Sequence, residues 1–205
     1  MVYIIILLNF FVYAVDYMFG VTESMALYPE AYREWWRFLT YGFMHAPPDS
    51  GAGISHIAVN MFTLFIFGPK LCRQYGSIRF LCIYLLCTAV GGFFWVLTQP
   101  MGVGNYLMGA SAGVIGIITL YAFHFPKSTF LPLPTPIGVY MFPCRGAMSA
   151  WSLTVAIIAY NLCGLGNTTS IVAYWGHLGG IVVAIIVGQN HLLKMYQQKL
   201  DFQKS

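Results

Sequence analysis

Two short glycine-rich motifs contain the residues of this sequence that are best suited to nucleophilic chemistry. Residues 109–113 read Gly-Ala-Ser-Ala-Gly around Ser111, and residues 176–180 read Gly-His-Leu-Gly-Gly and include His177. Glycines such as Gly109 permit a sharp turn into a helix, which leaves the serine hydroxyl beside free backbone N–H groups that can hold an oxyanion. A histidine can act as the general base for such a serine. The motifs therefore favour acyl transfer, although each alone is also explained by close helix packing or by a structural histidine.

A second polar pair, His56 and Asn60, precedes the serine in the chain. The two residues are four positions apart, so they share one face of a helix. An asparagine amide or a histidine N–H can donate a hydrogen bond to an oxyanion. The alternative is a purely structural role in hydrogen bonding between helices.

A carboxylate that could orient His177, as in a serine triad, is not evident in the sequence. Asp16 is the only acidic residue within the apolar segments described below, and we expect it to cap a helix or to lie at the membrane interface. We therefore predict a serine–histidine dyad in which packing or an aromatic ring orients His177. No motif has the spacing of metal ligands, so neither a metal nor a cofactor is expected.

The composition indicates that membrane helices position these residues. Hydrophobic residues make up 59% of the 205 residues, charged residues only 8%, and the mean hydropathy is +0.71. A soluble domain is about a quarter charged and a disordered chain is poor in aromatics, so both classes are excluded. We predict an all-α polytopic membrane protein in a single domain over residues 1–205. Its six expected spans are residues 2–20, 55–71, 78–98, 111–125, 149–165 and 174–193.

The distribution of basic residues predicts the orientation of these spans. With both termini in the cytoplasm, eight Lys and Arg lie on the inside, and only Arg33 and Arg37 lie in the outside loop, residues 21–54. The net charge of +4 is therefore a topology signal and predicts no nucleic-acid binding. The span that begins at Ser111 is short for a bilayer, so Ser111 is expected below the outer surface, with the site open to the outside.

Small residues predict which spans pack together. Gly176, Gly180, Ala184 and Gly188 recur every four positions and form one stripe along the last span. If the span that carries Ala112 packs on this stripe, Ser111 and His177 come within reach of each other. The five prolines of residues 126–143 predict an irregular inside loop, and the positions of the five cysteines give no disulfide framework.

Together these motifs resemble the rhomboid family of intramembrane serine proteases, in its basic six-span prokaryotic form. The resemblance extends over nearly the whole chain and rests on motifs that occur in the family's order: Trp36-Arg37, His56-x-x-x-Asn60, Gly-Ser-Ile at 76–78, Gly109-x-Ser111, and Gly-His-Leu-Gly-Gly at 176–180. Two positions depart from the family pattern. Ala112 follows the serine where many members have glycine, and Cys72 stands where some members have an acidic residue.

The resemblance implies a role for each matching residue. Ser111 would be the nucleophile and His177 its general base, while His56 and Asn60 would form the oxyanion hole with backbone N–H. The loop with Trp36-Arg37 would brace the fold, and we expect His45 to strengthen the same loop by hydrogen bonds. Substrates would be membrane-anchored proteins cut in or near their spans, and a bacterial inner membrane is the expected location.

Two other classes of function compete with proteolysis. A non-catalytic member that binds transmembrane helices would lack the serine or the histidine, and this chain has both. A small channel or transporter would be expected to show charged residues within spans or an internal repeat, and the sequence shows neither clearly. The span over residues 149–165 could swing aside to admit a substrate.

Overall fold

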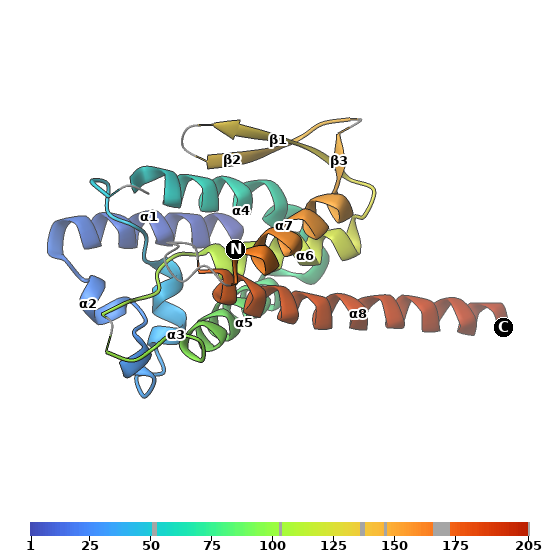
Figure 1. Cartoon of the computed structure of the whole chain (residues 1–205). Helices are drawn as coiled ribbons and strands as arrows, with labels where there is room; N and C mark the ends of the chain where they lie inside the picture. The colour runs from blue at the N-terminus through green and yellow to red at the C-terminus, as the bar shows by residue number, and fades with distance from the viewer. Residues whose placement is uncertain (51–52, 103, 136–137, 146, 166–172, 205) are drawn as a thin grey trace.

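The computed structural model describes residues 1–50, 53–102, 104–135, 138–145, 147–165 and 173–204. Four helices are long and apolar enough to cross a membrane: α1 (Val2–Phe19), α4 (Gly53–Tyr75), α5 (Ser77–Val96) and the part Tyr174–Gln198 of α8 (Tyr174–Lys204). Two shorter apolar helices, α6 (Ser111–His124) and α7 (Ala150–Gly164), complete the bundle. The predominantly helical membrane fold is therefore as predicted. Helix α8 extends past the predicted end at residue 193 and projects from the bundle (Figure 1).

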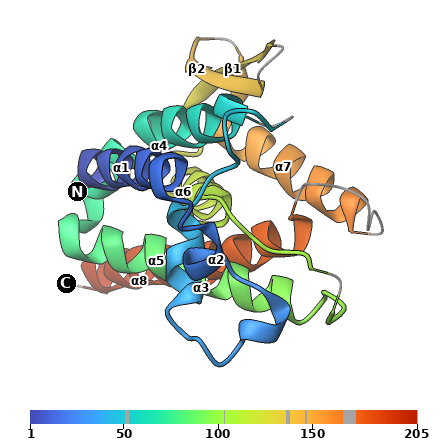
Figure 2. The same ribbon diagram turned by 90° about the vertical axis from the view of Figure 1, so that its left-hand side faces the viewer.

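Helix α6 occupies the centre of this bundle. Figure 2 shows it among α4, α5, α7 and α8, and it packs against all four. Ten of its fourteen residues are buried; all ten are uncharged and most are apolar. At about 1.5 Å per residue the helix is about 21 Å long, shorter than an apolar bilayer core of about 30 Å. The helix is therefore too short to span that core by itself, which is in line with the prediction that Ser111 lies below the outer membrane surface.

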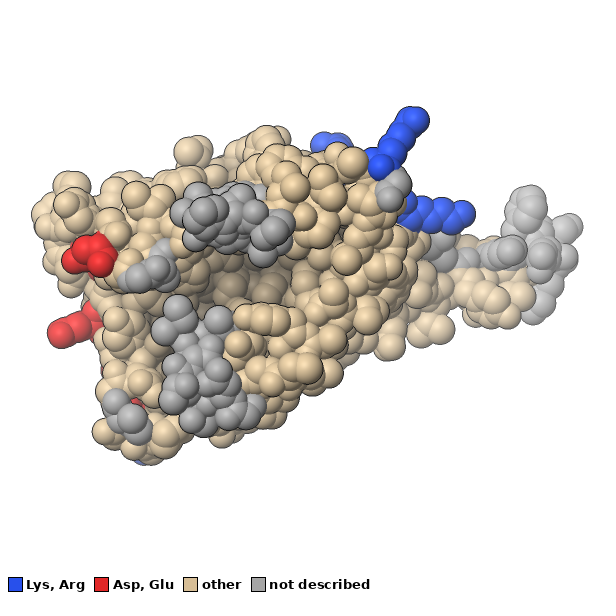
Figure 3. All heavy atoms as spheres, turned by 45° about the horizontal axis from the view of Figure 1, so that its top comes forward, with Lys and Arg blue, Asp and Glu red and all other residues tan. Residues whose placement is uncertain are grey.

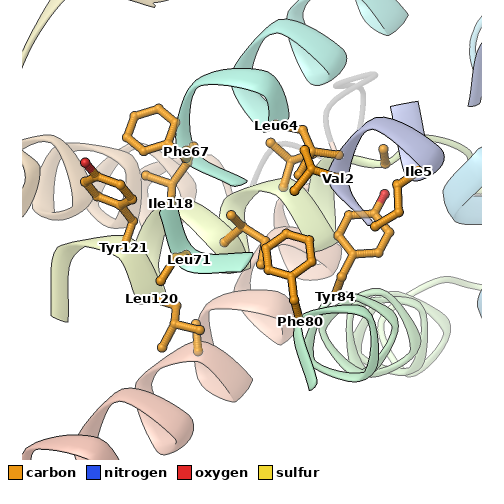
Figure 4. Close-up of a cluster of buried hydrophobic side chains, with 14 of the residues drawn as sticks. Val2, Ile5, Leu64, Phe67, Leu71, Phe80, Tyr84, Ile118, Leu120 and Tyr121 are labelled. Carbon is orange, nitrogen blue, oxygen red and sulfur yellow. The ribbon is translucent and has the colours of Figure 1, made fainter. Parts of the chain in front are cut away.

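The hydrophobic core joins α1, α4, α5 and α6. Large side chains from the four helices interlock there (Figure 4), and they include Val2, Ile5, Leu64, Phe67, Leu71, Phe80, Tyr84, Ile118, Leu120 and Tyr121. By contrast, Leu7 and Phe11 on the outer face of α1 are 68% and 65% exposed. Such large apolar side chains on a surface are typical of contact with lipid.

The segment between α1 and α4 is built from short helical turns: α2 (Thr22–Met25), α3 (Arg37–Thr40) and the 3₁₀ turns Pro29–Ala31 and Tyr41–Phe43. Leu27 and Leu107 exchange two backbone hydrogen bonds, and the Gly109 N–H donates to the Tyr41 carbonyl oxygen at 3.0 Å. This segment between α1 and α4, called the outer segment below, therefore holds the backbone directly before Ser111 in place by hydrogen bonds. The Thr22 hydroxyl donates its one hydrogen to the Asp16 carboxylate, whose two oxygens lie 2.9 and 2.8 Å from the hydroxyl oxygen, and this contact stabilises the turn after α1.

The prediction of an irregular segment over residues 126–143 was wrong, because most of it forms a β-hairpin. Strand β1 (Thr129–Thr135) pairs antiparallel with β2 (Gly138–Pro143), and a short β3 (Met148–Ser149) pairs only with the start of β1. Pro132 and Pro134 lie at positions of β1 that β3 does not reach, so one edge of the β1 backbone is unpaired there. Proline is tolerated at such an open edge because it needs no partner for a backbone N–H.

The hairpin lies against α4, beside α7 (Figure 1). The ring of Phe130 is buried and packs on Phe67 and Tyr121, with centroid distances of 4.6 and 5.7 Å. Further along the hairpin, Phe142 contacts Phe62 of α4 at 5.1 Å. The contacts of these aromatic rings with α4 and its neighbours thus hold a small sheet on the side of the bundle.

Candidate active site

Ser111 and His177 meet at the centre of the bundle. Ser111 is the first residue of α6, His177 lies in the first turn of α8, and the Ser111 Oγ is 2.8 Å from the His177 Nε2. The Ser111 hydroxyl can donate to this ring nitrogen, which is the geometry of a nucleophile and its base. The two residues are separated by 65 others in sequence, so their contact depends on how α6 packs against α8.

The predicted glycine stripe makes this packing possible. A Cβ at Gly180 would overlap the Ala112 carbonyl oxygen, and a Cβ at Gly116 would lie 3.1 Å from the Gly180 oxygen and 2.5 Å from the Cys87 Sγ. The backbones of α6 and α8 therefore approach more closely than any side chain would allow. The span that carries Ala112 therefore packs on the stripe, as expected, and Gly116 lies against the stripe as well.

Gly109 brings His56 next to the serine. The φ angle of Gly109 is +122°, a conformation that other residues adopt only with strain. A Cβ at this position would lie 2.7 Å from the His56 Nε2 and 3.9 Å from the Ser111 Oγ. The ring nitrogen and the hydroxyl oxygen are therefore both close to the position that a side chain of residue 109 would occupy. Glycine is required here both for the turn and for the approach of the imidazole.

The second ring nitrogen of His56 has a different partner. The Ala46 backbone N–H donates to the His56 Nδ1 over a long distance of 3.4 Å. A neutral His56 with an accepting Nδ1 carries its proton on Nε2, which is the nitrogen that borders Gly109. His56 therefore presents an N–H to the space beside Ser111.

Asn60 lies one turn further along α4, buried at 6% exposure. Its Nδ2 donates to the His56 carbonyl oxygen at 2.9 Å. One of its two amide hydrogens is thus used within its own helix, and the other stays available for a ligand. The structure places His56 and Asn60 on one helix face, as the spacing predicts.

His45 strengthens the site by packing and not by the hydrogen bonds that we expected. It is 1% exposed, its ring lies 5.0 Å from the His56 ring, and neither of its nitrogens has a partner among the described residues. Burial, followed by the proximity of His56, lowers the pKa of His45 to about 3. At neutral pH, His45 is therefore an uncharged ring that packs against His56.

Arg37 and Trp36 occupy the outer segment, away from the serine. The guanidinium of Arg37 donates to the Glu34 carboxylate at 2.7 Å and to the carbonyl oxygens of Glu23 and Ala26 at 2.7 and 2.8 Å. It is only 9% exposed and ties three turns of the segment together. The Trp36 side chain is 42% exposed, as suits a ring at the membrane interface.

One neighbour of His177 was missed by the sequence analysis. The Asn161 Oδ1, from the last turns of α7, lies 2.7 Å from the His177 Nδ1. Asn161 is 1% exposed within a helix that is otherwise mostly apolar. A polar amide in a membrane span is itself a signal of function, and this rule would have singled it out.

The surface of the molecule is polarised and hollowed. Lys and Arg gather mainly at the end from which α8 projects, and Asp and Glu at the opposite end (Figure 3). The same view shows a hollow in the face that carries the hairpin. Helices α4 and α7 both pack against α6, but they make no extensive contact with each other in the described part of the chain.

Comparison with known proteins gives a consistent result. A family model described as the Rhomboid domain matches residues 32–192. The chain is similar to the rhomboid protease GluP of Bacillus subtilis, with 30% identity over 80% of this chain and 27% of that protein. It is also similar to the putative rhomboid protease YdcA of the same species, with 33% identity over 44% of this chain and 41% of that protein.

A human relative, Rhomboid-related protein 3, is 27% identical over 94% of this chain and 45% of its own length. The chain thus spans less than half the length of each of these three relatives.

Proposed function

Because the chain belongs to the rhomboid family, we propose that it is an intramembrane serine endopeptidase in which Ser111 is the nucleophile and His177 its base. The observation that carries this proposal is the distance of 2.8 Å between the Ser111 Oγ and the His177 Nε2. The short distance links Ser111, the first residue of the buried helix α6, to a histidine on another span. Helices long enough to cross a membrane surround the pair, in keeping with an integral membrane protein.

In the proposed reaction, the Ser111 oxygen attacks the carbonyl carbon of the scissile peptide bond while the His177 Nε2 takes the hydroxyl proton. The carbonyl oxygen becomes an oxyanion. When the tetrahedral intermediate collapses, the C–N bond breaks and His177 gives its proton to the leaving amine. Water then attacks the acyl-serine while His177 takes one of its protons; the bond between the carbonyl carbon and the Ser111 Oγ breaks, His177 returns the proton to the serine oxygen, and the second product leaves with a free carboxylate.

Three donors are proposed to hold the oxyanion. They are the Ser111 backbone N–H, the His56 Nε2–H and the second amide hydrogen of Asn60. The position of the His56 ring beside Gly109 and its accepting Nδ1 support this role. Donors fixed before the reaction stabilise developing charge more than mobile water does, and each is typically worth about 10²- to 10³-fold in kcat.

The substrates are proposed to be membrane-anchored proteins, cut in or near their transmembrane segment. A peptide bond at this depth is reached only by a chain that lies in the membrane or descends into it. The gathering of basic residues at the α8 end supports an orientation with both termini in the cytoplasm. The site would then open to the outer face, in a bacterial inner membrane.

Cleavage of a fluorogenic single-span substrate by the purified protein tests the proposal. Wild type should cut the substrate, and Ser111→Ala and His177→Ala should each lose activity while their thermal unfolding and detergent elution profiles stay unchanged. Undiminished cleavage by Ser111→Ala would contradict the assignment. A folded wild type that binds but cuts none of a panel of single-span substrates would favour a non-catalytic helix-binding member of the family.

A further inference from the structure

The imidazole of His177 has a partner on each of its two nitrogens. Its Nε2 faces the Ser111 Oγ at 2.8 Å, and its Nδ1 faces the Asn161 Oδ1 at 2.7 Å. A histidine that acts as a base must present an unprotonated nitrogen to the serine, so the location of its single proton decides whether it can react. The partner on Nδ1 therefore matters as much as the serine.

The orientation of the Asn161 amide follows from a second hydrogen bond. Its Nδ2 donates to the Ile157 carbonyl oxygen, one turn back in α7, at 2.8 Å. A carbonyl oxygen can only accept, so the amide nitrogen must face Ile157 and the amide oxygen must face His177. Helix α7 itself thus prevents the amide from flipping.

The fixed amide in turn selects the tautomer of His177. The Asn161 Oδ1 has no hydrogen to donate, so a hydrogen bond across 2.7 Å requires the proton on the His177 Nδ1. The Nε2 then has a free lone pair directed at the Ser111 hydroxyl. This is the tautomer that a general base needs, and the opposite tautomer would present an N–H to the serine.

We propose that Asn161 is a positioning residue that holds His177 in its reactive tautomer and orientation, a role that rests on the function proposed above. It performs with a neutral amide what a carboxylate performs in a serine triad. The one acidic side chain within α1, Asp16, is occupied by the Thr22 hydroxyl. The expectation that packing or an aromatic ring alone orients His177 is replaced by this hydrogen bond.

The location of Asn161 links this role to substrate entry. Helix α7 packs less extensively on α6 and α8 than α8 does on α5 and α6, and it makes no extensive contact with α4. If a substrate enters between α4 and α7 by displacing α7, the hydrogen bond to His177 breaks. The tautomer of His177 is then no longer fixed by Asn161, so hydrolysis is fastest when α7 has returned to the closed arrangement.

Substitutions of Asn161 in the full-length protein test the proposal. Asn161→Leu keeps the volume and removes the acceptor, whereas Asn161→Asp keeps an acceptor for the His177 Nδ1–H. Asn9→Leu is the matched control, because Asn9 is equally buried and its Nδ2 donates to the Ile5 carbonyl oxygen, one turn back in α1, at 2.7 Å. This control measures the structural cost of losing such an amide far from the serine.

Two readouts are measured for each variant. The first is kcat and KM with a fluorogenic single-span peptide. The second is the ¹⁵N NMR signal of the histidine ring in labelled protein in lipid, where the His177 signal is the one absent from His177→Ala. The NMR signal reports the tautomer without any need for turnover, so it remains informative if no substrate is cleaved.

We expect Asn161→Leu to lower kcat about 10- to 100-fold with little change in KM, because misplacement of a catalytic group acts on the reacting state. Asn161→Asp should recover at least part of this loss, and Asn9→Leu should keep wild-type kcat. The His177 Nδ1–H signal should dominate in wild type and give way to mixed tautomers in Asn161→Leu.

An Asn161→Leu variant with the kcat of Asn9→Leu, or with an unchanged His177 tautomer, would overturn the proposal. If wild type shows the Nδ1–H tautomer but no cleavage, the proposed function fails while the placement by Asn161 stands.

Discussion

Gly91 offers a test of the site from a helix that contributes no reacting group. It lies in α5, and a Cβ at this position would be 2.6 Å from the Ala112 Cβ and 2.6 Å from the Gly176 carbonyl oxygen. Ala112 follows Ser111 in sequence, and Gly176 precedes His177. A single methyl group at Gly91 would therefore push on the neighbours of both reacting residues at once.

The size of the effect follows from these distances. Non-bonded carbon atoms normally approach to about 3.5–4.0 Å, so Gly91→Ala requires α6, α8 or both to move by about 1 Å. Misplacement of reacting groups by about 1 Å can cost about 100-fold in rate, which corresponds to about 2.7 kcal/mol in activation free energy. Overpacking should also lower the free energy of unfolding by about 1–3 kcal/mol.

The assay compares kcat, KM and thermal unfolding of Gly91→Ala with those of Ala89→Val. Ala89 lies two positions earlier in α5 and borders an open groove lined by Trp35, Phe38 and Phe93, so added methyl groups find space there. We expect a loss of kcat in Gly91→Ala and near wild-type values in Ala89→Val. Equal kcat and equal melting temperatures for the two variants would refute the inference that close packing at Gly91 sets the distance between Ser111 and His177.

Three further predictions concern the surroundings of the site. Phe130→Ala should lower the free energy of unfolding by about 3–5 kcal/mol, measured by thermal or denaturant unfolding, because it removes the ring that packs on Phe67 and Tyr121; a change below 1 kcal/mol would show that the hairpin is not anchored there. Arg37→Lys should lower the melting temperature nearly as much as Arg37→Ala, because one ammonium cannot replace the planar guanidinium that reaches a carboxylate and two carbonyl oxygens; full stability of the lysine variant would contradict this. The pKa of buried His45 is about 3, so below pH 6.5 the unfolded chain binds a proton that the folded protein does not, and the free energy of unfolding should fall by about 2 kcal/mol between pH 7.5 and 5 from this residue alone. His45→Phe should show a smaller acid-induced decrease in melting temperature than wild type, and an equal decrease would exclude the effect.

The helical part of the fold was predictable because its determinants are local. Apolar length and the glycine spacing near Gly180 suffice to predict membrane helices and the face on which α8 receives α6. The contact of Ser111 with His177 followed from that packing. The hairpin was not predictable in the same way, because five prolines favour irregular backbone, and its strands depend on the contacts that Phe130 and Phe142 make with helix α4 and its neighbours.

Asn161 shows a second limit of sequence reasoning. The sequence lacks an acidic partner for His177, and this led to a prediction of a dyad without a third residue. Whether an amide in one span reaches a histidine in the next depends on the rotation of α7 about its axis, which residue spacing within α7 does not determine. In the structure, Leu153, Thr154 and Asn161 lie on the buried side of α7, and this rotation of the helix directs the Asn161 amide to His177.

Covalent labelling of Ser111 tests the central claim most directly, because it requires no knowledge of the natural substrate. A fluorophosphonate reacts with a serine hydroxyl only when a neighbouring base activates it, so intact-mass analysis of the protein in detergent measures activation. We predict one adduct in wild type, located at Ser111 by peptide mapping, and no adduct in Ser111→Ala or His177→Ala at the same exposure. Equal labelling of wild type and His177→Ala would contradict the claim that His177 activates Ser111.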